Sequence, residues 1–162
     1  MAFSDNERMI FGKGVGCVVI NDGKVLLGRH NYGRGKGLLI IPGGFINEGE
    51  LPAEAAEREV LEETNVKVKT KEIVSMRFTE NDWYLIFRAE YISGEAKVND
   101  SENSEVIWLC VEEALNKKDV PPLSKEAIKS CLKFINSENK YAMSIKEDYD
   151  ASRELGSYAY YD

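Results

Sequence analysis

The chain of 162 residues has one histidine, His30, and three cysteines without a Cys-x-x-Cys pair among them. A single histidine excludes a histidine-rich zinc site, and nothing near it resembles the nucleophile turn of a Ser-His-Asp hydrolase. The odd number and wide spacing of Cys17, Cys110 and Cys131 favour buried free thiols over a disulfide or a zinc site. We therefore expect a reducing, cytoplasmic location.

Long apolar segments and an excess of basic residues are also lacking. No apolar run approaches the length that spans a membrane, and the first residues carry no signal-peptide core. The formal net charge of −7 argues against nucleic acid or an anionic membrane as a partner, although a bound metal ion can still attract a small anion. No Gly-x-x-x-x-Gly-Lys-Ser/Thr phosphate loop is present, so the glycine-rich segment 33–37 is interpreted as a mobile loop, with phosphate contact as the alternative.

Acidic residues are concentrated in the segment that follows Pro42-Gly43-Gly44. Because a helix turns about 100° per residue, Glu59, Glu62 and Glu63 fall on one face of a predicted helix. Each pair of carboxylates at about 6 Å costs roughly 0.7 to 3 kcal/mol, depending on the effective dielectric. Such a cluster is stable if solvent or a cation neutralises it, and carboxylate oxygens suit a hard divalent cation such as Mg²⁺. The alternative is a solvated acidic surface.

The spacing of this segment is more specific than an acidic surface requires. It resembles the signature of the Nudix hydrolases: Gly, five residues, Glu, seven residues, Arg-Glu, an aliphatic residue, any residue, Glu-Glu, any residue, Gly and an aliphatic residue. The matching residues are Gly44, Glu50, Arg58, Glu59, Val60, Glu62, Glu63 and Val66, and average residue usage gives such a match by chance on the order of once in a million chains of this length. The closing glycine is replaced by Asn65, which also adopts the left-handed conformation that ends many helices.

The resemblance implies a Nudix-type α/β/α sandwich with a mixed β-sheet. It also implies hydrolysis of the pyrophosphate bond of a nucleoside diphosphate linked to a group X, with Mg²⁺ or Mn²⁺ as cofactor. By the same resemblance, Glu59, Glu62 and Glu63 form the metal set together with the backbone carbonyl of Gly43, and Glu59 is either a ligand or the base that orients water. Glu50 is then the salt-bridge partner of Arg58, although Glu54, one helical turn before Arg58, competes for that pairing.

Further site residues are expected outside this segment. The resemblance implies an additional acidic residue from a later loop, for which Glu102 and Glu105 are the candidates for metal binding or water positioning, against the interpretation as solvent-facing side chains. Arg29 resembles a family position that touches substrate phosphate, with a surface arginine as the alternative. The candidate base-stacking aromatic residues, each with burial in the core as its alternative, are Phe45, Tyr32, Trp83 and Tyr84.

The pattern of apolar residues predicts one domain over residues 1–138 and a tyrosine-rich tail over 139–162. The tail is expected to be poorly ordered, with docking onto the domain or a partner chain as the alternative. Asn21-Asp22-Gly23-Lys24 predicts a tight turn, and Pro121-Pro122 is expected to separate the last two helices. The predicted strands are 14–20, 25–28, 38–41, 66–78 (with a bend), 83–92 and 105–111, and the predicted helices are 51–64, 112–117 and 125–136.

Three functional classes follow from the sequence. The first is an active pyrophosphohydrolase, for which a sugar nucleotide such as ADP-ribose is the first expectation and a (d)NTP or dinucleoside polyphosphate the rival substrate. The second is a nucleotide-binding Nudix module without catalysis. Such a module usually lacks some carboxylates of the signature, whereas this chain retains all of them. The third is a structural acidic protein. A homodimer is the commonest arrangement of soluble oligomers and is expected here as an alternative to a monomer.

Overall fold

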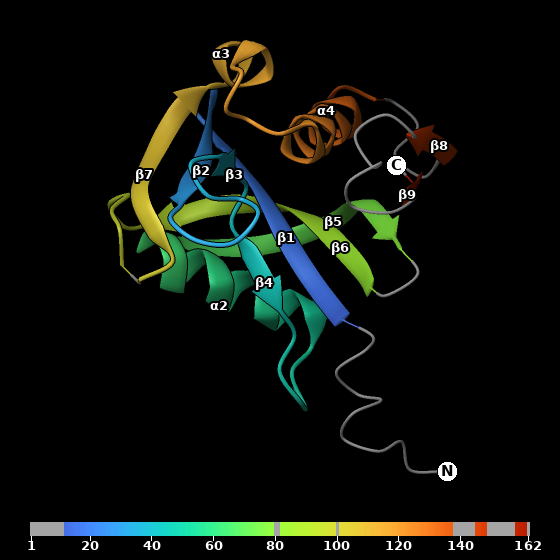
Figure 1. The fold of residues 1–162 in the computed structure, drawn as a ribbon, viewed down its shortest axis with the longest axis horizontal. Coiled ribbons are helices and arrows are strands. Elements are labelled where there is room, and N and C mark those ends of the chain that lie inside the picture. Colours follow the sequence, from blue (N-terminus) through green and yellow to red (C-terminus); the bar gives the residue numbers. More distant parts are fainter. Residues whose placement is uncertain (1–11, 80–81, 100, 138–144, 149–157, 162) are drawn as a thin grey trace.

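The computed structural model describes residues 12–79, 82–99, 101–137, 145–148 and 158–161. In these ranges the chain forms strands of 2 to 12 residues and three helices, as Figure 1 shows. The elements are β1 (Gly12–Asn21), β2 (Lys24–His30), β3 (Leu39–Ile40), β4 (Gly43–Phe45), α2 (Pro52–Thr64), β5 (Lys67–Phe78), β6 (Asp82–Ser93), β7 (Asn103–Cys110), α3 (Val111–Asn116), α4 (Pro122–Asn136), β8 (Ile145–Asp148) and β9 (Tyr158–Tyr161).

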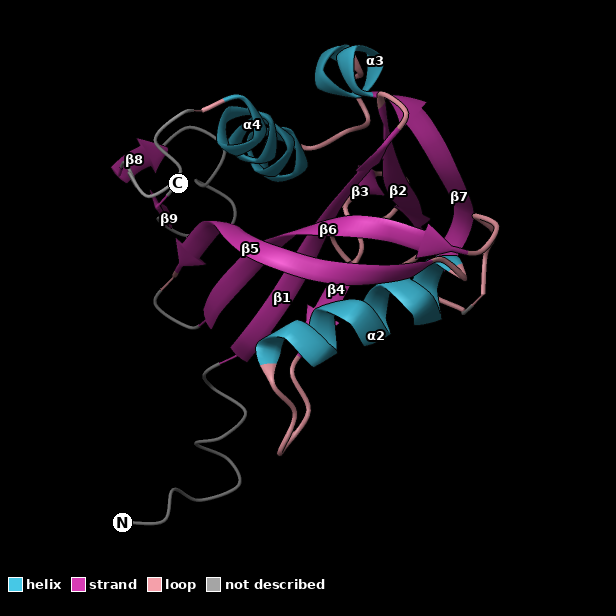
Figure 2. Ribbon diagram, turned by 180° about the vertical axis from the view of Figure 1, so that it is seen from behind, coloured by secondary structure: helices cyan, strands magenta, loops and turns pink. Residues whose placement is uncertain are grey.

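The strands form a mixed sheet in the order β3-β2-β1-β6-β5-β9-β8, while β4 pairs with β1 and β7 pairs with β2. The pairing of β1 with β6 is parallel and the other pairings are antiparallel. Helix α2 covers one face of this sheet and α4 covers the other, as Figures 1 and 2 show from opposite sides. The expected α/β/α sandwich with a mixed sheet is therefore confirmed.

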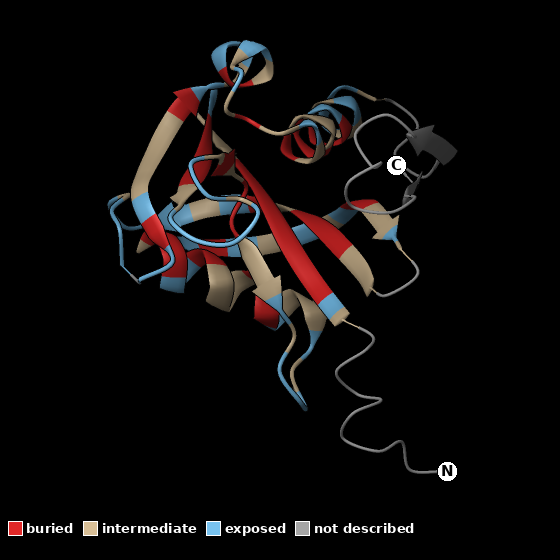
Figure 3. Ribbon diagram, in the orientation of Figure 1, coloured by how far each residue is buried: buried red, intermediate tan, exposed pale blue. Residues whose placement is uncertain are grey.

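Two hydrophobic cores lie on the two faces of the sheet, and β1 contributes to both. Val15, Cys17 and Val19 pack with the apolar side of α2, whereas Val18 packs with residues of α4. This division follows from the alternation of side chains along a strand. In Figure 3, β1 is the most continuously buried strand because helices cover both of its faces.

The local turns follow from residue type. Asp22 and Gly23 both have positive φ, of 47° and 73°, which is the conformation that a two-residue hairpin between β1 and β2 needs. The long strand β5 carries shifts in its register with β6, which confirms the expected bend.

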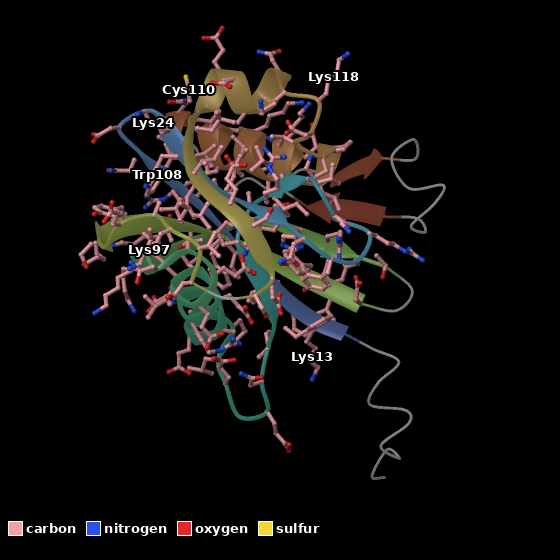
Figure 4. All side chains as sticks on the ribbon, turned by 60° about the vertical axis from the view of Figure 1, so that its left-hand side comes forward. Lys13, Lys24, Lys97, Trp108, Cys110 and Lys118 are labelled. Atoms are coloured by element: carbon pink, nitrogen blue, oxygen red, sulfur yellow. The ribbon has the colours of Figure 1, made fainter. Side chains whose placement is uncertain are left out.

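The structure corrects three expectations. The segment Gly43–Phe45 forms a strand, β4, that the sequence pattern did not indicate. Helix α4 begins at Pro122, so this proline starts the helix rather than preceding it, as its fixed φ and missing N–H allow. Cys110 is exposed because it is the last residue of β7 and alternates with the buried Leu109; Figure 4 shows it where β7 meets α3. Cys17 and Cys131 are buried free thiols, as expected.

The described parts of the tail extend the sheet. Strand β9 pairs antiparallel with β5, with Met76 opposite Tyr161, and β8 pairs with β9. Residues 138–144, 149–157 and 162 lie outside the described part of the chain, so the division into a domain of 1–138 and a tail stays a prediction. Among the described residues, none of the helices has the length and apolar character needed to cross a membrane.

Candidate active site

Helix α2 is fixed at both ends by local contacts. Its first residue is Pro52, and the Glu54 carboxylate accepts a hydrogen bond of 3.1 Å from the Leu51 backbone N–H before the helix begins. At the other end Asn65 is left-handed, with φ of 60°, and its side chain donates to the Glu95 carbonyl at 3.0 Å. Asn65 thus adopts the conformation that the family signature assigns to glycine, as expected.

The diglycine segment before the helix is shaped by close approach to its neighbours. A Cβ atom on Gly44 would lie 2.6 Å from Cδ of Glu59, so any larger residue would displace that carboxylate. A Cβ on Gly43 would collide with the Val15 carbonyl and the Tyr84 hydroxyl. Space therefore requires glycine at position 43, where the neighbours include backbone, whereas Gly44 permits the Glu59 carboxylate to lie against β4.

Arg58 joins the loop between β4 and α2 to the helix and contacts three carboxylates. Its guanidinium donates to both oxygens of Glu50, at 2.7 and 2.9 Å, and to the Phe45 carbonyl at 3.0 Å. The same side chain donates to Glu59 at 2.7 Å and to Glu62 at 3.0 Å. The expected ion pair with Glu50 is present, and its hydrogen bonds lower the pKa of the Glu50 carboxyl. The competing Glu54 is instead the residue that contacts the Leu51 N–H.

Glu59 and Glu63 form the less accessible part of the acidic face. Glu63 is 2% exposed, and Glu62 lies at the rim with a side chain 56% exposed. The pKa of Glu59 is raised, first by burial and then by the charges of Glu62 and Glu102, against the opposing effect of Arg58. The pKa of Tyr84 is likewise raised by burial and by the charge of Glu63. The negative charges of Glu62 and Glu102 thus disfavour the ionised form of Glu59, as like charges do.

The structure distinguishes the two loop glutamates. Glu102 accepts a hydrogen bond of 2.7 Å from the Tyr32 hydroxyl and acts electrostatically on Glu59. Glu105 is paired across the sheet with Arg29, which donates to its carboxylate at 2.6 Å. Glu102 is therefore held by the Tyr32 hydroxyl, whereas Glu105 takes part in a separate ion-pair network.

Arg29 is held by acceptors from three segments. Besides Glu105 it donates to Asp119 at 2.8 Å and to the carbonyl of Gly37 at 2.8 Å. Asp119 was missed at the sequence level because it lies 90 positions away, in a loop without a motif. This network connects β2, β7 and the loops at 33–37 and 117–121, and the expected contact of Arg29 with substrate phosphate stays a prediction.

The candidate aromatic residues divide into two groups. Tyr84 packs on the α4 side of the sheet, in the space left by Gly14 and Gly16, and Trp83 packs on the α2 side. Tyr32 and Phe45 have 50% and 69% of their surface exposed. Trp83 and Tyr84 are therefore partly buried against the two cores, and the rings of Tyr32 and Phe45 are accessible.

A divalent cation fits the chemistry of this face. The described part of the chain contains no group of three His, Cys, Asp or Glu side chains already gathered around one point, because Arg58 draws the oxygens of Glu59 and Glu62 to itself. The donors are nevertheless hard carboxylate oxygens, and burial of Glu63 and of Glu59 disfavours their charged forms, which a divalent cation would favour. Rotation of Glu59 and Glu62 away from Arg58 would free them as ligands.

Comparisons with known proteins agree with this arrangement. The family model described as NUDIX domain matches residues 10–131. Nudix hydrolase 2 of Arabidopsis thaliana is 33% identical over 113 residues, 64% of this chain and 41% of that protein. The NAD-capped RNA hydrolase NudC of Photorhabdus laumondii is 31% identical over 97 residues, 57% of this chain and 37% of that protein. The chain thus spans about two fifths of the length of these relatives.

Solved structures share the fold. A Nudix hydrolase from Nitrosomonas europaea superposes with a TM-score of 0.68 at 25% identity, over 76% of this chain and 70% of that chain. A bifunctional NMN adenylyltransferase/ADP ribose pyrophosphatase from Francisella tularensis, complexed with AMP and a Mn ion, superposes with a TM-score of 0.65 at 19% identity. That match covers 75% of this chain and 41% of the other.

Proposed function

The chain belongs to the Nudix family, and from that premise we propose that it hydrolyses the pyrophosphate bond of a nucleoside diphosphate linked to a second group. The observation that carries the proposal is the acidic face of α2. Glu63 is buried, the partly buried Glu59 lies against Gly44, and Glu102 acts on Glu59 from the loop before β7. A surface that served only solubility would not bury two of its carboxylates.

The proposed ligands of Mg²⁺ or Mn²⁺ are Glu59, Glu62 and Glu63 together with the backbone carbonyl of Gly43. These residues would hold a divalent ion, which would lower the pKa of a bound water and neutralise phosphate oxygens. Arg58 has a positioning role, because its bidentate contact with Glu50 and its bond to the Phe45 carbonyl hold the loop on the helix. Within this scheme, Glu50 and Arg58 shape the site and the α2 carboxylates hold the ion.

Glu102 is the proposed residue for orienting the attacking water. The Tyr32 hydroxyl fixes its carboxylate at 2.7 Å, and its charge is felt by Glu59. Glu105 is the weaker candidate because its carboxylate is engaged by Arg29. Glu59 is the alternative base. Its raised pKa means that it holds a proton at a higher pH than an ordinary glutamate does.

A sugar nucleotide such as ADP-ribose is the proposed first substrate, with a (d)NTP or a dinucleoside polyphosphate as the rival. The run Ile41-Pro42-Gly43-Gly44-Phe45 resembles that of family members acting on sugar nucleotides, which supports the first choice. The fold shared with the Francisella protein, whose description names ADP ribose pyrophosphatase, supports it as well. One relative is described as an NAD-capped RNA hydrolase, and NAD is therefore added to the substrates to be tested. The proposed location is the cytoplasm, on the ground that the three cysteines are free.

The test is turnover of a substrate panel with Mg²⁺. ADP-ribose, NAD, ATP, dATP and diadenosine tetraphosphate are each incubated with the full chain, and released monophosphate or phosphate is measured. We expect turnover of at least one compound and a loss of about 100-fold or more in the rate for Glu63→Gln, since a ligand of the ion is removed. Glu95→Gln, an exposed glutamate outside this face, is the matched control and should keep the wild-type rate. Wild-type protein that releases nothing from the panel would overturn the proposal in favour of a binding module.

A further inference from the structure

The aromatic ring of Tyr32 lies in the loop between β2 and β3 and packs against a neighbouring ring. Its ring stacks on that of His30, with centroids 5.7 Å apart and planes inclined by 14°. Half of the Tyr32 surface is exposed. A near-parallel pair with one ring open to solvent offers a flat surface to a further planar group.

The loop that carries this ring is fastened to the fold by hydrogen bonds along its length. The Gly37 N–H donates to the His30 carbonyl at 2.8 Å, and Arg29 donates to the Gly37 carbonyl at 2.8 Å. The Asn31 N–H donates to the Glu102 carbonyl at 2.9 Å. A ring held in this way loses little conformational freedom when a ligand stacks on it, which lowers the cost of binding.

The ring lies next to Glu102. The Tyr32 hydroxyl donates to the Glu102 carboxylate at 2.7 Å. The Asn99 side chain, in the same loop as Glu102, donates to the Leu61 carbonyl of α2 at 3.3 Å, so the loop that contacts Tyr32 lies against the helix that carries the acidic face. A nucleotide whose diphosphate lay at that face would bring its base near this loop.

We propose that the Tyr32 ring, supported by His30, is the platform on which the nucleobase of the substrate stacks. The inference deepens the proposed function and rests on it for the identity of the substrate. Stacking on an aromatic ring tolerates every base because every base has a π-face. Tyr32 thus favours nucleoside phosphates over sugar phosphates without selecting one base.

Binding of the product-like ligand AMP tests this inference without turnover. The Kd of AMP and of ribose 5-phosphate, which lacks a base, is measured by calorimetry with Mg²⁺ present for the full chain and its variants. Tyr32→Leu should weaken AMP binding about tenfold or more and leave ribose 5-phosphate unchanged. Tyr32→Phe keeps the ring and should bind AMP within about twofold of the wild type. Phe78→Leu, which removes a partly exposed ring on β5, is the matched control and should bind both ligands as the wild type does.

Three results would overturn the inference. They are unchanged AMP binding by Tyr32→Leu, an equal loss of AMP and ribose 5-phosphate binding, and a wild-type chain that binds no nucleoside monophosphate. Weakened AMP binding by Phe45→Leu with unchanged binding by Tyr32→Leu would assign the platform to Phe45 instead. If Tyr32→Leu loses AMP while the wild type hydrolyses nothing, the platform stands and only the proposed hydrolysis fails.

Discussion

Glu59 shows at the scale of one residue how the acidic face depends on its neighbours. Its carboxylate lies against Gly44, accepts from Arg58 and has its pKa raised chiefly by burial. The contact with Gly44 comes from β4, the hydrogen bond from Arg58 comes from α2, and the burial comes from the packing of these two elements. The signature residues therefore act on one carboxylate from several sides, and a change in any of them is felt at the site.

Gly44→Ala should impair metal binding more than folding. The new Cβ would stand 2.6 Å from Cδ and from one oxygen of Glu59, and the end of a flexible side chain can move away. We expect the free energy of unfolding to fall by about 1 kcal/mol or less, and the affinity for Mn²⁺ to fall about tenfold. Urea unfolding and metal titration measure the two effects. A large loss of stability with unchanged metal affinity would contradict this account of Gly44.

At the scale of the element, α2 combines a predictable helix with a terminus that the family signature did not match. Asn65 ends the helix at φ of 60°, a conformation that costs most residues about 1 to 2 kcal/mol. Asparagine and glycine tolerate it better than alanine does. The departure from the signature is therefore structurally mild.

Asn65→Ala should destabilise the protein by about 1 to 2 kcal/mol, because alanine is strained here and the bond to the Glu95 carbonyl is lost. Asn65→Gly should stay within about 1 kcal/mol of the wild type, since relief of strain offsets the loss of that bond. Chemical denaturation of both variants gives the two numbers. Equal destabilisation by alanine and glycine would show that the hydrogen bond matters and the backbone conformation does not.

The elements that sequence reasoning found are those with strong local patterns. Helix α2 has a proline at its start, an apolar side and an asparagine at its end, and the hairpin after β1 has Asp22-Gly23. Strand β4 has only Gly43, Gly44 and Phe45, whose composition carries no strand signal; its pairing with β1 arises from backbone contacts that form in the folded chain. Helix α4 begins at Pro122, three residues before the predicted start at 125. In the sequence, a proline that starts a helix looks the same as a proline that interrupts one.

At the scale of the whole molecule, the choice between Glu102 and Glu105 depends on distant pairing. The register between β2 and β7 shifts between Arg29 and His30, so Arg29 stands opposite Glu105 and His30 opposite Asn103. Such a shift turns a neighbouring side chain to a different face, and it cannot be inferred from one strand alone. The carboxylates of the signature could be identified from their spacing in the sequence. The residues of the Arg29 network could be identified only in the folded chain.

The Arg29 network should make stability depend on pH. The hydrogen bond from Arg29 holds the pKa of Asp119 below its ordinary value. A lowered folded-state pKa stabilises the protein above the unfolded pKa of about 3.9, and this contribution is lost as the pH falls through the folded value. The contribution is modest because both side chains are partly exposed to solvent.

Arg29→Met should therefore cost about 1 kcal/mol of unfolding free energy at pH 7, and the difference from the wild type should shrink below about pH 4. Lys129→Met, which removes an exposed pair with Glu126, is the control and should change stability by less than about 0.5 kcal/mol at either pH. Denaturation curves at several pH values provide the comparison. A difference between Arg29→Met and wild type that is the same at pH 3 and pH 7 would contradict the role given to Asp119.

Divalent metal binding by the α2 carboxylates is the central claim, and titration with Mn²⁺ followed by electron paramagnetic resonance tests it most directly. The free ion gives a strong signal that is lost on binding, so the number of sites and their affinity are read without any substrate. The wild-type chain is predicted to show saturable binding that Glu63→Gln weakens at least about tenfold, with Glu95→Gln unchanged. Absence of saturable binding in the wild type, or equal binding by the wild type and Glu63→Gln, would contradict the claim.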